Sequence, residues 1–243
     1  MLFRSVPPQE VAAILVEPIQ GEGGYLVPPD SFLPGLRELC DRHGILLIFD
    51  EVQSGIGRTG KMFASQHFEV VPDIMSLAKG LGSGLPIGMV VAKASIMQKW
   101  KRGAHGNTFG GNPVCCAAAL ATLDLVQNGL MANAASVGDY FMGKLRELQA
   151  RHQVIGEVRG RGLMLGMELV TDRASKAAAK ELCDKVVDRA YYNGLLLLAC
   201  GKSTVRFMPP LSVSRAEVDE AVDILEQTLA ECSAAPRAGA QAR

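Results

Sequence analysis

Three polar residues, Glu17, Asp50 and Lys79, follow short apolar runs that have the composition of buried strands. The three runs are Val11–Val16, Ile45–Phe49 and Asp73–Leu77. An acidic side chain directly after a buried strand is costly to desolvate unless it has a partner. A lysine in the same position can lose its proton when water is excluded, and the neutral amine is then a nucleophile. The pattern therefore predicts a site in which a carboxylate and a reactive amine act together.

Each of these residues also has an ordinary structural interpretation. Asp50 and Glu51 are compatible with a surface turn or a helix cap, and a lone lysine such as Lys79 is more often solvated. One chemistry that requires both groups is that of pyridoxal 5′-phosphate (PLP), which a lysine holds as an imine while a carboxylate keeps its pyridine nitrogen protonated. The protonated ring then accepts the electrons of the carbanion formed at the substrate carbon.

Buried strands alternate with amphipathic helices in the first half of the chain. A fourth apolar run covers Gly88–Ala92, and Ser31–His43 has leucines at helical spacing, with Gly44 as a stop signal. Runs rich in Ile, Leu and Val that are separated by helices are typical of an α/β fold with a mainly parallel sheet and flanking helices. Ligands of such sheets bind beyond the carboxyl ends of the strands, which is where the three polar residues lie.

The second half of the chain predicts two long helices followed by a smaller α+β unit. The helices are Pro113–Leu125 and Met131–His152; the smaller unit contains a glycine-punctuated strand Val158–Leu169, a helix Ser175–Asn193, strands Leu195–Ala199 and Val205–Met208, and a helix Ser214–Cys232. We therefore expect a large domain over residues 1–152 and a small C-terminal domain over 153–233. The tail, 234–243, is rich in Ala, Gly, Pro and Arg and is expected to be disordered.

The composition excludes several classes of function. The 243 residues carry 25 basic and 25 acidic side chains, and this net charge of zero leaves no electrostatic footprint for nucleic acid or for an anionic membrane. We find no apolar stretch that is long enough to cross a bilayer. The 6 cysteines include no C-x-x-C pair, and we expect them to be reduced and buried in a cytoplasmic protein, without a metal site.

Three glycine-containing segments carry the polar residues at the strand ends, and a fourth segment follows them in the chain. The segments are Glu17–Gly24 (EPIQGEGG), Phe49–Gly60 (FDEVQSGIGRTG), Pro72–Leu81 (PDIMSLAKGL) and Asn107–Pro113 (NTFGGNP). All four, in this order, resemble the class III aminotransferases, a group of PLP enzymes of fold type I that includes the 4-aminobutyrate, ornithine, acetylornithine and β-alanine transaminases. The resemblance covers nearly the whole chain up to the tail, and it implies PLP as the cofactor.

The resemblance implies a role for five residues at the cofactor. Lys79 matches the Schiff-base lysine, which also moves a proton between the substrate α-carbon and the cofactor. Asp50 matches the acid that pairs with the pyridine nitrogen, Val52 the apolar residue on one ring face, and Gln53 the residue at the phenolic oxygen. Thr108 matches a hydroxyl that reaches the phosphate of the neighbouring subunit's cofactor, which implies a homodimer. Core packing for Val52 and a helix cap for Thr108 are the structural alternatives.

Glu17 and Arg206 match a second pair of family residues, which bind substrate. In the ornithine and aminobutyrate branches the glutamate pairs with the arginine in one half-reaction, and the arginine binds the α-carboxylate of the oxo acid in the other. A planar guanidinium suits a carboxylate because it donates two parallel hydrogen bonds. The alternative for Arg206 is a surface residue of a strand. Arg159 and Arg161, in what we interpret as a glycine-flanked turn, are expected to serve structure.

The resemblance implies transfer of an amino group from an amine or ω-amino acid donor to an oxo acid such as 2-oxoglutarate or pyruvate, by ping-pong Schiff-base chemistry. Relative to the family, the chain lacks an N-terminal segment that carries the phosphate-binding turn and part of the sheet, so the large domain is expected to be partial and activity impaired. Two alternatives stay open. One is a racemase or epimerase of the same family, suggested by Ala199–Gly201 and Met208–Leu211. The other is a non-catalytic, truncated dimerisation fragment.

Overall fold

The computed structural model describes residues 6–233, which divide into two compact units. The first unit comprises residues up to Gly21 and the range Leu26–Ser136, and the second comprises Glu22–Tyr25 and the residues from Val137 onward. The division falls inside helix α4 (Met131–Arg151), whereas the sequence placed a domain boundary at the end of that helix, near residue 152. The tail predicted to be disordered, 234–243, lies outside the described residues.

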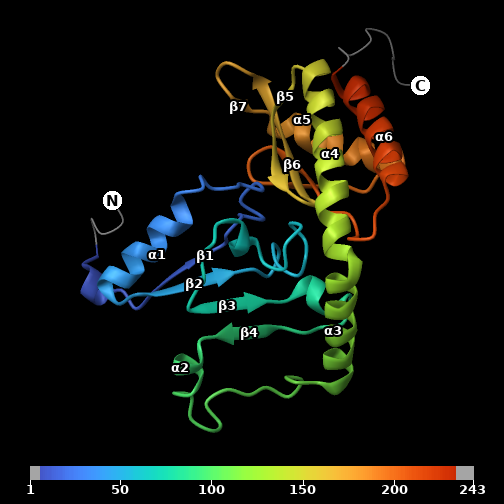
Figure 1. The fold of residues 1–243 in the computed structure, drawn as a ribbon. Helices are drawn as coiled ribbons and strands as arrows, with labels where there is room; N and C mark the ends of the chain where they lie inside the picture. The colour runs from blue at the N-terminus through green and yellow to red at the C-terminus, as the bar shows by residue number, and fades with distance from the viewer. Residues whose placement is uncertain (1–5, 234–243) are drawn as a thin grey trace. The chain divides into compact units, whose positions relative to one another are not determined.

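The first unit contains a four-stranded sheet that is parallel except for its last strand. The strands are β1 (Ala13–Val16), β2 (Leu46–Asp50), β3 (Ile74–Leu77) and β4 (Met89–Ala92), and they lie in that order. The pairs β1–β2 and β2–β3 are parallel, and β4 runs antiparallel to β3, as the arrows of Figure 1 show. The mainly parallel sheet predicted from the apolar runs is confirmed, and each strand begins one or two residues later than predicted.

Helix α1 (Phe32–His43) connects β1 to β2. It buries Leu33, Leu36 and Cys40, and it ends at Gly44, whose φ of 68° allows its N–H to bond the carbonyl of Cys40. Four short helices complete the connections of this unit: η1 (Pro8–Glu10), η2 (Ala64–His67), η3 (Lys79–Gly82) and α2 (Ala94–Met97).

Two long helices, α3 (Pro113–Leu125) and α4, follow one another through a short kinked segment, η4 (Val126–Leu130). The combined helix Pro113–Arg151 spans 39 residues, contains a window of mean hydropathy 1.5, and is long and apolar enough to cross a membrane by length and composition alone. The expectation that no stretch has this property was therefore wrong. The break predicted at Asn128–Gly129 is nevertheless present, because Gly129 has a non-helical backbone, with φ 161° and ψ −40°, and the 39-residue span is kinked there.

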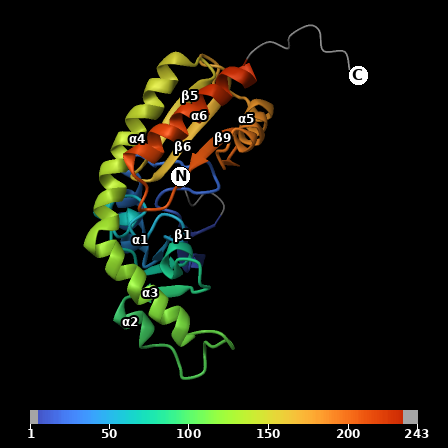
Figure 2. The ribbon, with the colours of Figure 1, turned by 90° about the vertical axis from the view of Figure 1, so that its right-hand side faces the viewer.

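The second unit contains an antiparallel sheet with the strand order β5–β6–β9–β8. The strands are β5 (Ile155–Arg161), β6 (Met164–Asp172), β9 (Thr204–Phe207) and β8 (Leu198–Cys200), and the short β7 (Ala177–Ala178) pairs with β6. Helices α5 (Lys180–Tyr192) and α6 (Arg215–Ser233) lie side by side over this sheet (Figure 2). Part of α4 packs here as well, with the rings of Phe141 and Phe207 5.2 Å apart between their centroids.

Two predicted elements of the second unit need correction. The single strand predicted over Val158–Leu169 is a hairpin of β5 and β6, which turns at Gly162 with a φ of 55°. The helix predicted to begin at Ser175 begins at Lys180, because the residues before it form a turn and the edge strand β7. Gly162 forms the turn of the hairpin inside the stretch predicted as a single strand. The residues before Lys180 likewise form a turn and a short strand instead of the first turns of the helix.

The cysteines are interior residues, as predicted. Five are buried and Cys116 is half-buried, and all are free. Burial raises the pKa of Cys183 and of Cys200 to about 11, so both thiols stay protonated at neutral pH.

Candidate functional site

The carboxyl ends of β1, β2 and β3 meet at one edge of the first unit's sheet. Val16 pairs with Phe49, and Asp50 pairs with Ser76, so the residues that follow each strand share this edge. The backbone N–H of Glu51 donates to the carbonyl of Ser76 at 3.0 Å and extends the parallel pairing by one residue. The structure therefore brings the segments that carry Glu17, Asp50 and Lys79 to the edge at which parallel sheets bind ligands.

Asp50 presents a carboxylate with one oxygen occupied. It is the last residue of β2, it is half-buried, and its Oδ1 accepts a hydrogen bond from the backbone N–H of Val52 at 2.9 Å. Within residues 6–233, Oδ2 has neither a hydrogen bond nor an ion pair. The alternative interpretation of Asp50 as a helix cap is not supported, since 3-10 helix η2 begins more than ten residues later.

Lys79 is the first residue of η3, two positions after β3 ends. Its backbone is left-handed, with a φ of 42°, a conformation that costs a residue with a Cβ on the order of 1–2 kcal/mol. The side chain is exposed, and in the part of the chain that the structure describes its amine forms no hydrogen bond or ion pair. A strained, unpaired lysine at the edge of a parallel sheet suits a group that is to react with a ligand.

The loop after β2 is held by a buried carboxylate, that of Glu51. Glu51 is 1% exposed, and its carboxylate accepts hydrogen bonds from the Ser54 hydroxyl at 2.7 Å and from the backbone N–H groups of Ala64 and Ser65 at 2.9 and 2.7 Å. The sequence placed Glu51 in a possible surface turn and missed this function. The feature of the sequence that could have indicated this function is the position of Glu51, a second acidic residue after a buried strand.

Val52 and Gln53 stand at the start of this loop. Val52 is half-buried and Gln53 is buried. The side chain of Gln53 lies so close to Gly21 that a Cβ there would be 2.6 Å from the Gln53 Oε1 atom. The close approach of Gln53 to Gly21 links two of the four segments on which the family resemblance rests.

Glu17 and Thr108 have separate surroundings within the first unit. The half-buried carboxylate of Glu17 accepts a hydrogen bond at 2.6 Å from the backbone N–H of Gly21, which fixes it in the turn after β1. Thr108 is exposed in the segment before α3 and forms no hydrogen bond within the described residues. The cap of α3 is Asn112, whose side chain accepts from Val114 N at 2.9 Å, so the capping alternative for Thr108 is wrong.

Arg206 lies on β9 in the second unit, and its guanidinium forms an ion pair with Glu22. The side chain of Arg206 is 18% exposed and that of Glu22 is 67% exposed, so the pair stands at the surface of the unit. Glu17, which the resemblance gives as the partner of Arg206, belongs to the first unit, and that pairing stays a prediction. The sequence did not single out Glu22.

The segment Glu22–Tyr25 is bound to the second unit's sheet by residues far along the chain. The carbonyl of Glu22 accepts from Gly201 N at 2.9 Å, and the carbonyl of Gly24 accepts two hydrogen bonds from Arg159, at 3.0 and 2.7 Å. Tyr25 is fully buried, and its hydroxyl donates to the sulfur of Met208 at 2.9 Å. Arg159 thus serves structure as predicted, although it lies on strand β5 rather than in a turn.

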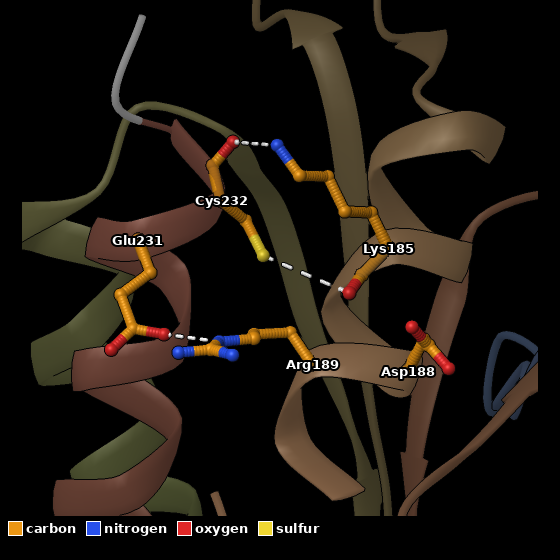
Figure 3. Close-up of a pocket in the computed structure, with 5 residues that line it drawn as sticks. All are labelled: Lys185, Asp188, Arg189, Glu231 and Cys232. Carbon is orange, nitrogen blue, oxygen red and sulfur yellow. Dashed lines mark hydrogen bonds and ion pairs between the residues drawn. The ribbon is translucent and has the colours of Figure 1, made fainter. Parts of the chain in front are cut away.

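A cavity of about 380 Å³ lies between α5 and α6 and contains none of the predicted site residues. It is lined by Lys185, Asp188, Arg189, Glu231 and Cys232 (Figure 3). Arg189 and Glu231 form an ion pair at 2.5 Å, and the amine of Lys185 donates to the carbonyl of Cys232 at 3.2 Å. These two contacts join α5 to α6, so the residues that make them serve helix packing. Residues 6–233 also contain no cluster of His, Cys, Asp and Glu placed to hold a metal ion.

The mixed α/β fold, with its mainly parallel sheet and flanking helices, is that of PLP fold type I. The family model described as aminotransferase class III matches residues 2–229, and the chain belongs to this family. It is 46% identical to 5-aminovalerate aminotransferase DavT of Pseudomonas aeruginosa over 223 residues, which are 90% of this chain and 52% of that protein. It is 45% identical to a leucine/methionine racemase of Thermococcus litoralis, covering 91% of this chain and 50% of the relative.

Solved structures give the same assignment. A PLP-bound amine transaminase from an uncultivated Pseudomonas species superposes with a TM-score of 0.87 at 40% identity, over 93% of this chain and 53% of that one. Ornithine δ-aminotransferase of Plasmodium falciparum gives a TM-score of 0.84 at 35% identity, over 93% and 58% of the two chains. The chain therefore spans about half the length of the relatives that it matches.

The residues present fit PLP, the cofactor of this family. Asp50 offers a carboxylate oxygen without a partner at the sheet edge, and Lys79 offers an unpaired amine at the same edge. Residues 6–233 contain no cluster suited to a metal ion. They do contain the carboxylate that a pyridine nitrogen requires and the amine that an aldehyde requires.

Proposed function

We propose that this chain carries the cofactor lysine of an aminotransferase that moves an amino group from an amine or ω-amino acid to an oxo acid such as 2-oxoglutarate or pyruvate. The observation that carries the proposal is the shared sheet edge of Asp50 and Lys79, each with an unpaired reactive atom. The names of similar proteins support an ω-amino donor, since 5-aminovalerate and acetylornithine aminotransferases are 46% and 45% identical to the chain.

Each site residue has a defined task in this proposal. PLP, when bound, supplies an aldehyde and a ring that accepts electrons from the substrate carbon. The carboxylate of Asp50 would hold a proton on the ring nitrogen, and the amine of Lys79 would hold the aldehyde and serve as the group that moves a proton at the substrate α-carbon. Val52 would pack on one face of the ring, and the amide of Gln53 would donate to the phenolic oxygen.

Substrate recognition falls to Arg206 and Glu17. Arg206 binds the α-carboxylate of the oxo acid through its planar fork. Glu17 pairs with Arg206 while a donor with a distal amine is bound, so that the arginine is neutralised in that half-reaction. Thr108 reaches the cofactor phosphate of a second subunit, and the active species is therefore a homodimer. A cytoplasmic location is part of the proposal, supported by 6 cysteines that are all free.

A racemase or epimerase activity is the second candidate. Its support is the leucine/methionine racemase at 45% identity and an isoleucine 2-epimerase of Lentilactobacillus buchneri at 41%. The same lysine and carboxylate serve both reactions, because each begins with removal of the α-proton. The two activities differ in whether an oxo acid leaves the enzyme. A non-catalytic dimerisation fragment is the third candidate, supported by the half-length match to relatives.

The test begins with cofactor capture. The 243-residue chain is mixed with PLP, reduced with borohydride, and mapped by peptide mass spectrometry; a pyridoxyl group on Lys79 is the expected result. A separate sample of the chain, mixed with PLP but not reduced, is incubated with 5-aminovalerate, acetylornithine or leucine, each with 2-oxoglutarate. Glutamate formation identifies an aminotransferase, and inversion of leucine without glutamate identifies a racemase. A folded wild-type chain with no label on Lys79 would contradict both activities and favour the non-catalytic fragment.

A further inference from the structure

The backbone of the lysine segment has left-handed residues at both ends. Lys79, with a φ of 42°, begins η3, and Ser83, with a φ of 45°, follows its last residue. Neither is glycine, so both conformations are unfavourable for an isolated chain and persist only when the surroundings hold them. The direction in which the Lys79 side chain leaves the sheet edge depends on whatever holds this one-turn helix.

Bonds within the segment supply part of the restraint. The N–H of Leu81 donates to the carbonyl of Ala78 at 2.9 Å, and the N–H of Ser83 donates to that of Gly80 at 3.3 Å. The side chain of Leu81 is 1% exposed and anchors the turn. A single 3-10 turn is a weak structure by itself, since its hydrogen-bond geometry is poor. A contact from outside the segment is therefore needed.

Helix α3 provides that contact. It packs against η3 and passes the end of β3 at which η3 lies (Figure 1). Thr122 of α3 is 8% exposed, and its Oγ1 lies 2.9 Å from the Oγ of Ser83, which stands 39 positions earlier. Among residues 6–233, this is the one side-chain hydrogen bond that reaches Lys79–Ser83 from another element.

Which hydroxyl donates in this hydrogen bond follows from the single proton that each hydroxyl carries. Thr122 Oγ1 also lies 2.9 Å from the carbonyl of Ala118, one turn earlier in α3. A hydroxyl donates one proton, so both contacts are made when Thr122 donates to Ala118 and accepts from Ser83. The other acceptor near the Ser83 hydroxyl, the carbonyl of Gly80, is 3.5 Å away and weaker.

We propose that Thr122 is a positioning residue for Lys79: through Ser83 it fixes η3 and thereby the direction of the lysine amine. This inference rests on the proposed function, in which Lys79 binds the cofactor. It assigns to a buried threonine of a packing helix a specific effect on the reactive lysine, through Ser83, which stands 39 positions before the threonine. The hydroxyl, rather than the volume of the side chain, is the feature required.

The first test measures the order of the segment by hydrogen–deuterium exchange in the full 243-residue chain. Thr122→Val keeps the shape and removes the hydroxyl, and the amides of Leu81 and Ser83 should exchange roughly three- to tenfold faster. Thr122→Ser should restore the wild-type rate. Thr228→Val is the matched control, because Thr228 is a fully buried helical threonine that bonds the carbonyl of Ile224 at 2.7 Å in the other unit. It should leave this segment unchanged.

The second test measures the lysine itself. At a PLP concentration that labels part of the wild-type chain, Thr122→Val and Ser83→Ala should each lower borohydride labelling of Lys79 severalfold, and combining them should lower it no further. Ser83→Ala also replaces Thr122→Val should that variant fail to fold. Unchanged exchange in both variants, equal acceleration in Thr122→Ser, or faster exchange with unchanged labelling would each overturn the inference. If the wild-type chain captures no PLP, the proposed function fails, and the exchange comparison alone decides whether Thr122 holds the segment.

Discussion

Arg206 on β9 is ion-paired with Glu22, a residue 184 positions earlier in the chain. The pair occupies the guanidinium that is proposed to bind the oxo-acid carboxylate, so substrate and Glu22 compete for the same donors. Glu22 is held at this place by its carbonyl, which accepts from Gly201 N at 2.9 Å. The arginine is thus kept oriented and neutralised while no carboxylate is bound.

The first prediction concerns this competition. Glu22→Gln should strengthen binding of 2-oxoglutarate, because it removes the carboxylate that competes for the Arg206 guanidinium. The increase should be only roughly two- to fivefold, because an exposed ion pair contributes little energy. Arg206→Ala should weaken binding on the order of tenfold or more, because a charged hydrogen bond is lost. Isothermal titration of the chain with 2-oxoglutarate measures both effects. Arg206→Lys keeps the charge without the fork and should fall between wild type and alanine; equal affinities for all the variants would mean that another group binds the carboxylate.

The second prediction concerns the reactive amine. Lys79→Ala should abolish the visible absorbance of bound PLP and all borohydride labelling, because no other unpaired lysine is expected at the sheet edge. Lys79→Arg should do the same, since a guanidinium stays protonated and is not a nucleophile. Lys99→Ala, which removes an exposed lysine just after α2, serves as the control and should label normally. Labelling that persisted in Lys79→Ala would assign the cofactor to a different lysine.

The third prediction concerns the buried carboxylate that begins the turn into β3. Burial by itself would raise the pKa of Asp73, but hydrogen bonds from Leu47 N, Lys93 and Arg37 outweigh it and lower the pKa to about 2. A carboxylate whose pKa is depressed in the folded state stabilises the protein above its unfolded pKa, about 4. We therefore expect about 2 kcal/mol of stability to be lost as the pH falls from about 5 to 2.

Urea unfolding of Asp73→Asn at several pH values measures this contribution. The variant should be less stable than wild type at pH 7 by about 2–4 kcal/mol, and the difference should shrink towards pH 2. Asp41→Asn is the control: Asp41 also pairs with Arg37, at 2.7 Å, but its side chain is 65% exposed, so its loss should change the free energy of unfolding by less than about 1 kcal/mol. A pH-independent difference between Asp73→Asn and wild type would contradict the charge-based account.

The fourth prediction compares two glycines of α4. A Cβ at Gly138 would overlap the backbone of Gly162, whereas a Cβ at Gly143 would meet nothing within 4 Å. Gly138→Ala should therefore lower the free energy of unfolding by about 3 kcal/mol, because the helix and the hairpin turn must separate. Gly143→Ala should raise it by up to about 1 kcal/mol, because alanine favours the helix. Thermal unfolding followed by circular dichroism separates the two outcomes, and equal effects would mean that the close approach is relieved at no cost.

Local patterns predicted the strands and most helices well, because each depends on a contiguous run of residues. Strand β2 and helix α3 lie within one residue of their predicted bounds. The hairpin of β5 and β6 was missed because its turn residue, Gly162, stands in an otherwise apolar strand pattern. Edge strand β7 was missed because two alanines carry no strand signal.

The site was predictable where it follows strand ends and unpredictable where it depends on distant contacts. Asp50 and Lys79 could be placed at one edge because the carboxyl ends of parallel strands coincide. Glu22, Glu51 and Thr122 could not be assigned, since their partners lie 184, 13 and 39 positions away. The helical or strand periodicity of a single sequence does not indicate which distant residues will contact one another.

The membership of Glu22–Tyr25 in the second unit has a consequence for how the chain can be divided. The polypeptide passes between the two units three times, after Gly21, after Tyr25 and after Ser136. Residues 137–233 are therefore not a self-sufficient module: expressed alone, they would leave the donors of Arg159 without the Gly24 carbonyl and Arg206 without Glu22. A chimaera that exchanges this unit with a relative would have to carry both residues 137–233 and this tetrapeptide, which is encoded more than a hundred codons upstream.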